Sequence, residues 1–176
     1  VTALFLHADA GHLLANAEFN GTIGAIDRWC AQAPALVRED SGQSRAQPSL
    51  TFRTQLVPYA LVGVISPWNF PLTLSLIDAI PALLAGCAVL VKPSDVAPRF
   101  AVPLKRSIDA VPELATVLDF VAGDGRTGAE LVGVVNAVCF TGSVKTGRIV
   151  GQAAAKHFIP AFLELGGKDP LVVVES

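Results

Sequence analysis

The stretch LVGVISPWNFPLTLSLIDAIPALLAGCAVLVKP, residues 61–93, decides the fold of this protein. It begins with a short apolar run, LVGVIS, and passes through the proline-bracketed PWNFP into an apolar segment of helical length. It closes on a second short apolar run, AVLVKP. Two strands that flank a helix form a βαβ unit, and the strands of such a unit lie parallel and are buried on both faces. The stretch therefore predicts part of a parallel sheet.

The same alternation continues downstream. Apolar runs and helical patterns follow one another as far as PAFLEL, and a candidate sixth strand comes after it at LVVV, residues 171–174. This order predicts an α/β fold, an open parallel sheet with helices on both faces. Ligands of such sheets bind beyond the carboxyl ends of the strands. The segments in which we expect a site are therefore PWNFP, KPSD, AGDG, TGSVKTG and ELGGK.

The first part of the chain has a different character. Residues 1–44 carry apolar residues at spacings of three and four, which predicts an N-terminal helical segment running into the polar REDSGQSRAQPS. Residues 45–58 are predicted to form a linker and a hairpin strand, because TFRTQLV alternates apolar with polar residues. Residues 59–176 are predicted to form one domain around the parallel sheet.

The composition limits the classes of function. Of the 176 residues, 52% are hydrophobic and 16% are charged, against roughly 25% charged in ordinary soluble domains, so we expect large buried faces or an absent partner surface. A net charge of −2 without a basic run argues against nucleic acid as a partner. Between Thr54 and Val91 the only charge is Asp78, but four prolines and Asn69 interrupt this stretch. We therefore expect no membrane span.

The cysteines and histidines suggest neither disulfides nor a metal. Cys30, Cys87 and Cys139 lie far apart and are odd in number, which favours a reducing compartment, and we expect a cytoplasmic protein. Cys139, in NAVCF, is expected to be a strand-core residue. The histidines show no metal-ligand spacing, so no metal is expected.

Two glycine-rich segments each have a functional and a purely structural interpretation. GDGRTG, residues 123–128, matches G-x-G-x-x-G after a strand, but no acidic residue follows about twenty positions on, and a plain glycine turn explains it too. GSVKTGRI, residues 142–149, has P-loop spacing, but Arg148 and Ile149 stand where Lys and Ser/Thr are needed. This excludes nucleotide triphosphate hydrolysis. Ser143 at the helix start can hold a phosphate or act as a simple helix cap.

Three polar side chains stand at strand ends or in stiff loops. Lys92 ends AVLV, where it can meet a ligand or extend along the strand end into solvent. Asp95 can contact the same ligand or cap a turn. Asn69 lies between Pro67 and Pro71, which restrict its loop. Its amide can donate to a developing oxyanion or satisfy its own turn.

Taken together, the segments resemble the NAD(P)-dependent aldehyde dehydrogenase superfamily. The resemblance covers Val57 to the end of the chain, and the first 56 residues fit more loosely as N-terminal helices and an oligomerisation hairpin. It implies a Rossmann-like open sheet, as part of an aldehyde dehydrogenase fold. The motifs that carry the resemblance are GVISPWNFPL, AVLVKPSDVAP, VAGDGRTGAELV, VCFTGSVKTGRIVGQAAA and FLELGGKDPLVV.

The resemblance implies two catalytic residues and a coenzyme site. Asn69 would hold the substrate oxyanion, and Glu164, set in an apolar run, would be the general base that activates the hydrolytic water. Asp95 falls where many NAD-preferring members carry a glutamate to the ribose, so NAD is expected over NADP. The residues expected at the coenzyme are Ser66, Pro67, Trp68, Lys92, Ser94, Asp95, Gly123, Gly125, Thr141, Gly142, Ser143, Leu165 and Gly166.

The family's nucleophile, a cysteine, lies downstream of ELGGK, at a position that none of the three cysteines occupies. We therefore expect the chain to be the coenzyme-binding part of a longer enzyme, without its catalytic domain and inactive alone. The parent would oxidise a small-molecule aldehyde as a homodimer or homotetramer. Two other hypotheses are an inactive dinucleotide-binding or structural module and a reductase of acyl phosphates. The presence of both Asn69 and Glu164 argues against both.

Overall fold

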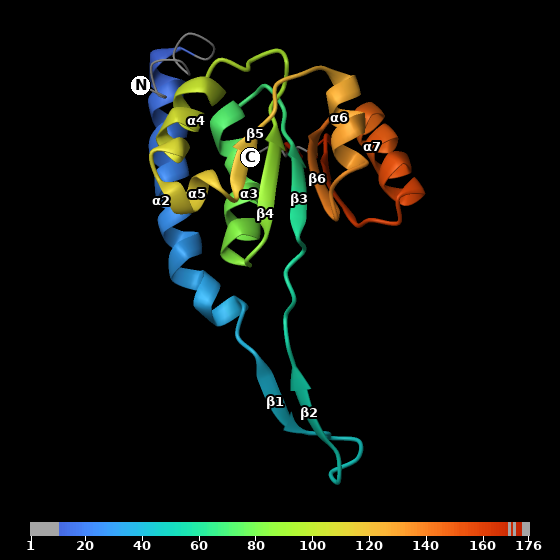
Figure 1. The fold of residues 1–176 in the computed structure, drawn as a ribbon. Helices are drawn as coiled ribbons and strands as arrows, with labels where there is room; N and C mark the ends of the chain where they lie inside the picture. Colours follow the sequence, from blue (N-terminus) through green and yellow to red (C-terminus); the bar gives the residue numbers. More distant parts are fainter. Residues whose placement is uncertain (1–10, 169, 171, 174–176) are drawn as a thin grey trace.

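The computed structural model describes residues 11–168, 170 and 172–173. It consists of a body built on a parallel sheet and a two-stranded hairpin that projects from the body (Figure 1). Residues 1–10 lie outside the described part of the chain, as do positions 171 and 174 of the candidate sixth strand LVVV. Val172 and Val173 are described and are in no strand.

The sheet confirms the predicted fold class. In the described part of the chain its five strands have the order β5-β4-β3-β6-β7, and every neighbouring pair is parallel. The chain therefore adds β4 and β5 on one side of β3, and then crosses back to add β6 and β7 on its other side. The strands are β3 (Leu61–Ile65), β4 (Ala88–Lys92), β5 (Leu118–Phe120), β6 (Ala137–Gly142) and β7 (Ala161–Leu165).

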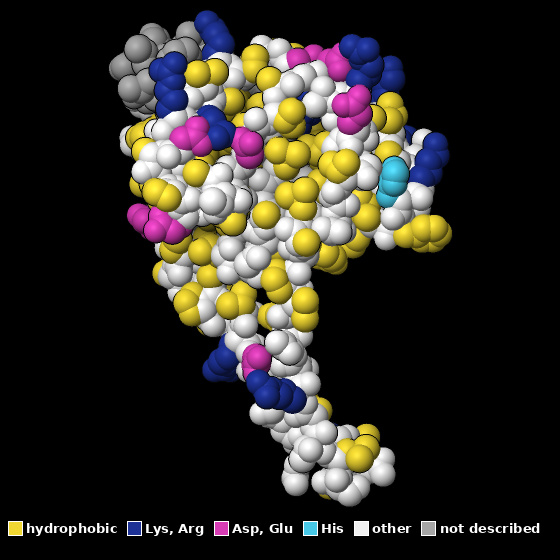
Figure 2. All heavy atoms as spheres, in the orientation of Figure 1, with side chains coloured by type: hydrophobic (Ala, Val, Ile, Leu, Met, Phe, Trp, Pro, Cys, Tyr) yellow, Lys and Arg dark blue, Asp and Glu magenta, His cyan; other side chains and the backbone are white. Residues whose placement is uncertain are grey.

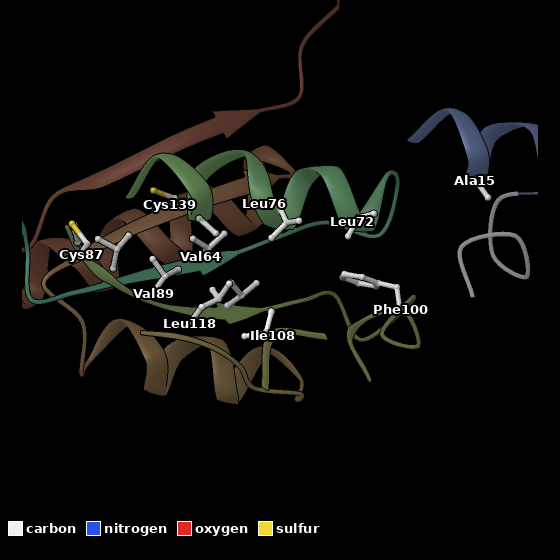
Figure 3. Packing of buried hydrophobic residues seen from close by; sticks show 14 residues of the cluster. Ala15, Val64, Leu72, Leu76, Cys87, Val89, Phe100, Ile108, Leu118 and Cys139 are labelled. Carbon is white, nitrogen blue, oxygen red and sulfur yellow. The ribbon is translucent and has the colours of Figure 1, made fainter. Parts of the chain in front are cut away.

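Helices cover both faces of the sheet, as predicted, and each face has its own core. On one face Val64 and Val89 pack beneath α3 (Pro71–Leu84) with Leu76 (Figure 3), and α2 (His12–Leu36) lies against the outer side of α3. On the other face Val138 and Phe140 of β6 pack against α6 and α7. The helices of the body are α3 (Pro71–Leu84), α4 (Ala101–Asp109), α5 (Pro112–Ala115), α6 (Gly125–Val132) and α7 (Val144–Lys156).

The N-terminal segment differs from its predicted boundaries. One helix, α2 (His12–Leu36), continues through its glycines and Pro34. The helical segment does not extend to residue 44, because Asp40–Gln43 forms β1, paired antiparallel with β2 (Thr51–Thr54). The sequence DSGQ has neither β-branched nor aromatic residues, so local propensity did not indicate a strand there. Both strands of the hairpin are exposed along their whole length.

Apolar and charged side chains are unevenly distributed on the surface. In the view of Figure 2, charged groups gather along the upper rim of the body and at the base of the hairpin, where Arg53 and Glu39 form an ion pair. Apolar side chains cover much of the surface between these regions. Among the described helices, none has the length and apolar character needed to cross a membrane.

Gly63 lies at the centre of the sheet, where β3 pairs with β4 and β6. A Cβ at Gly63 would lie 2.3 Å from Leu131 Cδ2 and 3.1 Å from Val135 Cγ1. Both partners are buried, so they have little room to move away. Glycine is needed here because α6 and the turn after it approach the backbone of β3 closely.

We expect Gly63→Ala to lower the free energy of unfolding of the complete protein by about 1–3 kcal/mol, the usual cost of overfilling a packed core. The matched control is Gly21→Ala, on the exposed side of α2, where an added Cβ meets no atom within 4 Å. It should be neutral or stabilising by up to about 1 kcal/mol, because alanine favours helix over glycine. Denaturant unfolding measures both variants, and equal midpoints would contradict the close packing at Gly63.

Candidate functional site

A cavity of about 1130 Å³ opens at the carboxyl ends of the strands. Its walls come from the segments after β3, β4, β6 and β7 and from α3, α6 and α7. Because the chain leaves β3 on one side and β6 on the other, the loops after these two strands diverge. Open α/β sheets bind ligands at such a point of reversal.

Fourteen of the fifteen residues expected at the site line this cavity. Gly123 is the exception: a Cβ there would lie 2.0 Å from Thr127 Oγ1, so this glycine serves the turn into α6. Asp124 caps α6 by accepting a hydrogen bond from the Arg126 backbone N–H. The lining residues from the expected set are Ser66, Pro67, Trp68, Asn69, Lys92, Ser94, Asp95, Gly125, Thr141, Gly142, Ser143, Glu164, Leu165 and Gly166.

The loop after β3 presents Asn69 at the cavity. Phe70 has a left-handed backbone with φ 56° and ψ 56°, which is rare for a bulky residue and rarer before a proline. Such strain persists only where the surroundings enforce it. At the start of the loop, buried Ser66 is hydrogen-bonded through Oγ to Ser75 Oγ of α3 at 2.7 Å. The hydroxyl of Ser66 is therefore engaged in holding the loop.

Lys92 is buried, with 5% of its surface exposed. Its stem passes along α6, where a Cβ on Gly128 would lie 3.7 Å from Lys92 Cδ. The ammonium donates to the Pro93 carbonyl at 3.0 Å. An ammonium has three donors, so others remain for a ligand in the cavity. The interpretation in which Lys92 extends along the strand end into solvent is therefore wrong. Asp95, three residues further along the chain, is exposed.

Helix α7 starts at the cavity wall. Ser143 is its N-cap, accepting from the Thr146 backbone N–H at 3.2 Å and donating to Thr146 Oγ1 at 3.0 Å. The capping interpretation therefore holds, and the same residue lines the cavity. Gly147 lets Leu165 pack over this helix, since a Cβ there would lie 2.4 Å from Leu165 Cδ2.

Glu164 lies on β7 opposite Thr141 of β6. The sequence suggested apolar surroundings, but the side chain is exposed. The reason is that β7 is the edge strand of the described sheet, and neighbouring Phe162 on the same face is 56% exposed. The carboxylate therefore borders the cavity and also faces the bare side of the sheet.

Asp78, on α3, was not among the expected site residues but lines the cavity with Glu164. Its partial burial raises the pKa of its carboxyl group, and the charge of Glu164 raises that pKa further. Its isolation as the only charge between Thr54 and Val91 was the signal that could have identified it.

The cysteines take no part in the cavity, since none of its described lining residues is a cysteine. Burial, with a smaller effect of the Asp78 charge, raises the pKa of Cys139 to about 12. This thiol is therefore protonated at neutral pH and is not a nucleophile, as expected for a strand-core residue. Among the described residues, no cluster of His, Cys, Asp and Glu is arranged to hold a metal ion.

Comparison with known proteins finds similar chains among proteins named as aldehyde oxidases or dehydrogenases. "4,4'-Diapolycopene aldehyde oxidase" of Methylomonas sp is 43% identical over 81% of this chain and 28% of its own length. Geranial dehydrogenase of Castellaniella defragrans is 41% identical over 81% of this chain and 31% of its own length. The solved structure of "Putative Aldehyde Dehydrogenase PutA" from Anabaena variabilis is 55% identical, with a TM-score of 0.92 over 96% of this chain and 36% of that one.

The chain thus spans about a third of the length of the relatives it matches. The family model described as "Aldehyde dehydrogenase family" matches residues 3–176, nearly the whole sequence. Both the sequence motifs at the cavity and the order of the strands around it accord with that match. The chain belongs to the aldehyde dehydrogenase family.

Proposed function

We propose that the complete protein oxidises an aldehyde to a carboxylic acid with NAD, and that this chain supplies the coenzyme site together with two catalytic side chains. The observation that carries the proposal is one cavity lined by both Asn69 and Glu164, together with buried Lys92 and the start of α7. A site for binding alone would need neither the amide nor the carboxylate.

The residues present fit a dinucleotide. Lys92 keeps a nearly buried ammonium beside the cavity, and a buried charge is costly unless it is paired. The start of α7 offers backbone N–H groups and the positive end of the helix dipole, which suit a pyrophosphate. An added Cβ on Gly125 would meet no atom within 4 Å, so this wall leaves room for a ligand. When bound, NAD supplies the hydride acceptor.

Two side chains of this chain would take part in the reaction. Asn69, held in its stiff loop, would donate from its amide to the oxyanion that forms when a cysteine thiolate from another part of the complete protein attacks the aldehyde carbon. Glu164 would accept a proton from the water that hydrolyses the resulting thioester. Its position beside the open edge of the cavity gives water access to the carboxylate.

Two other functions make different predictions. An inactive dinucleotide-binding or structural module would bind NAD without turnover in the complete protein. A reductase that passes its acyl group to phosphate would not need Glu164 as a base for water. Steady-state NADH formation from an aldehyde, dependent on Glu164, separates the proposal from both.

In the complete protein, we expect Glu164→Gln to slow steady-state turnover by about 10²–10⁴-fold, the usual contribution of a general base. The first turnover should stay near the wild-type rate, because the amide keeps the shape of the side chain and loses only the ability to take a proton. Stopped-flow measurement of NADH with geranial, the aldehyde in the name of the Castellaniella defragrans relative, reports both phases.

The matched control for this experiment is Glu113→Gln, on exposed α5 away from the cavity, which should change neither phase. If Glu164→Gln lowers the burst and the steady-state rate by the same factor, the role in thioester hydrolysis must be abandoned.

For the coenzyme, we expect NAD to be preferred over NADP, because Asp95 would accept from the ribose 2′-hydroxyl and repel a 2′-phosphate. Asp95→Asn removes the negative charge at nearly constant shape. It should lower the ratio of kcat/KM for NAD to that for NADP roughly tenfold, equivalent to about 1.4 kcal/mol.

The control for the coenzyme experiment is Asp27→Asn, at an exposed position of α2, which should leave that ratio unchanged. A wild-type enzyme that used NADP better than NAD would refute the assignment of Asp95.

A further inference from the structure

We propose that Glu18, on α2, is a positioning residue for the oxyanion site, because its carboxylate holds the first turn of α3 and thereby the loop that carries Asn69. This inference rests on the proposed function, which assigns the oxyanion to Asn69. Glu18 does not line the large cavity, so it would act through the backbone of α3 and not by touching the substrate.

The contact is direct and buried. Glu18 Oε1 accepts hydrogen bonds from the backbone N–H groups of Leu72, at 2.8 Å, and Thr73, at 3.0 Å. The side chain of Glu18 is only 4% exposed. One helical turn further along α2, Thr22 Oγ1 is hydrogen-bonded to Thr73 Oγ1 at 2.7 Å. Two side chains of α2 therefore hold the same turn of α3.

The start of α3 depends on this outside acceptor. Pro71 has no N–H to satisfy, and the Leu74 N–H donates to the Phe70 carbonyl at 2.9 Å. The N–H groups of Leu72 and Thr73 remain, and the local cap residue, Phe70, offers no side-chain acceptor. Helices usually solve this problem with a Ser, Thr, Asp or Asn at the cap. Here Glu18 replaces that cap from another helix.

The consequence for Asn69 follows from the short connection. Ser66 and Ser75 are joined by their hydroxyls at one end of the loop, and Glu18 holds the other end. Only residues 67–71 lie between these attachments, and Pro67 and Pro71 restrict two of them. With both ends held, the left-handed backbone of Phe70 is maintained and the amide of Asn69 keeps its direction.

A merely structural role for Glu18 is the competing explanation. The carboxylate is costly to bury: Oε2 has no hydrogen-bond partner among the described residues, and burial raises the pKa of this group above its ordinary value. Among the described residues, the contacts of its carboxylate are the two N–H groups of α3 and not a positive charge. What separates the two explanations is whether its loss acts specifically through Asn69.

The test uses the full-length protein, NAD and geranial, with the first turnover followed by stopped flow. We expect Glu18→Ala to slow the first turnover by about 10- to 100-fold, since misplacing a catalytic group by about 1 Å can cost on the order of 10²-fold. Glu18→Gln keeps the accepting oxygen and should retain most of the rate. Should Glu18→Ala not fold, Glu18→Asp replaces it, because its shorter side chain withdraws the oxygen from α3.

The decisive measurement is a double-mutant cycle with Asn69→Ala. If Glu18 acts through Asn69, the Glu18 substitution should add little in the Asn69→Ala background. Leu118→Ala, in the same core but on β5, two strands away from β3, controls for general destabilisation and should leave the first turnover unchanged.

The outcomes distinguish this inference from the proposed function. Additive effects of the Glu18 and Asn69 substitutions, or a loss in Glu18→Gln equal to that in Glu18→Ala, would overturn the positioning role alone. An unchanged first turnover in Asn69→Ala would overturn the oxyanion assignment, and the positioning role with it.

Discussion

The burial of β3 on both faces and along both edges is the constraint on which the rest of the structure depends. Its backbone pairs with β4 on one side and β6 on the other, while α3 and α6 press on its two faces. Close approach of α6 is possible because Gly63 has no side chain. Since the chain departs from β3 in one direction and returns to place β6 on the other side, the loops that follow these strands separate. The cavity is a result of that separation.

The chemistry of the cavity depends on how each strand end is held. Lys92 is buried against α6, and its charge lies beside the cavity. Ser143 follows β6 directly and caps the N-terminus of α7. Asn69 lies in a loop whose ends are attached to neighbouring helices through hydrogen bonds. Glu164, on the edge strand, is left exposed. The site therefore combines hydrogen-bonded groups at the ends of the inner strands with an accessible carboxylate at the edge, as the roles proposed for Asn69 and Glu164 require.

Much of this arrangement could be predicted from particular residues. The alternation of apolar runs with helical patterns located the strands of the body, and the carboxyl-end rule located the cavity. The residues expected at the site do converge there, with Gly123 as the exception. Other features were not accessible in this way. DSGQ carries no strand pattern and becomes β1 through its partner, and the partial burial of Asp78 depends on where α3 lies.

By itself, the sequence determined the order and type of the elements in the parallel sheet and its helices, and the polar groups at the strand ends, because hydrophobic periods of two and 3.6 residues are local properties of the chain. Only the tertiary structure decided which distant groups meet. Glu18 and Leu72 are 54 residues apart, and the sequence around either residue does not predict their contact. The exposure of Glu164 likewise follows from the edge position of β7 and not from its apolar neighbours in sequence. Such contacts depend on how the helices pack on the sheet, and no local pattern records that packing.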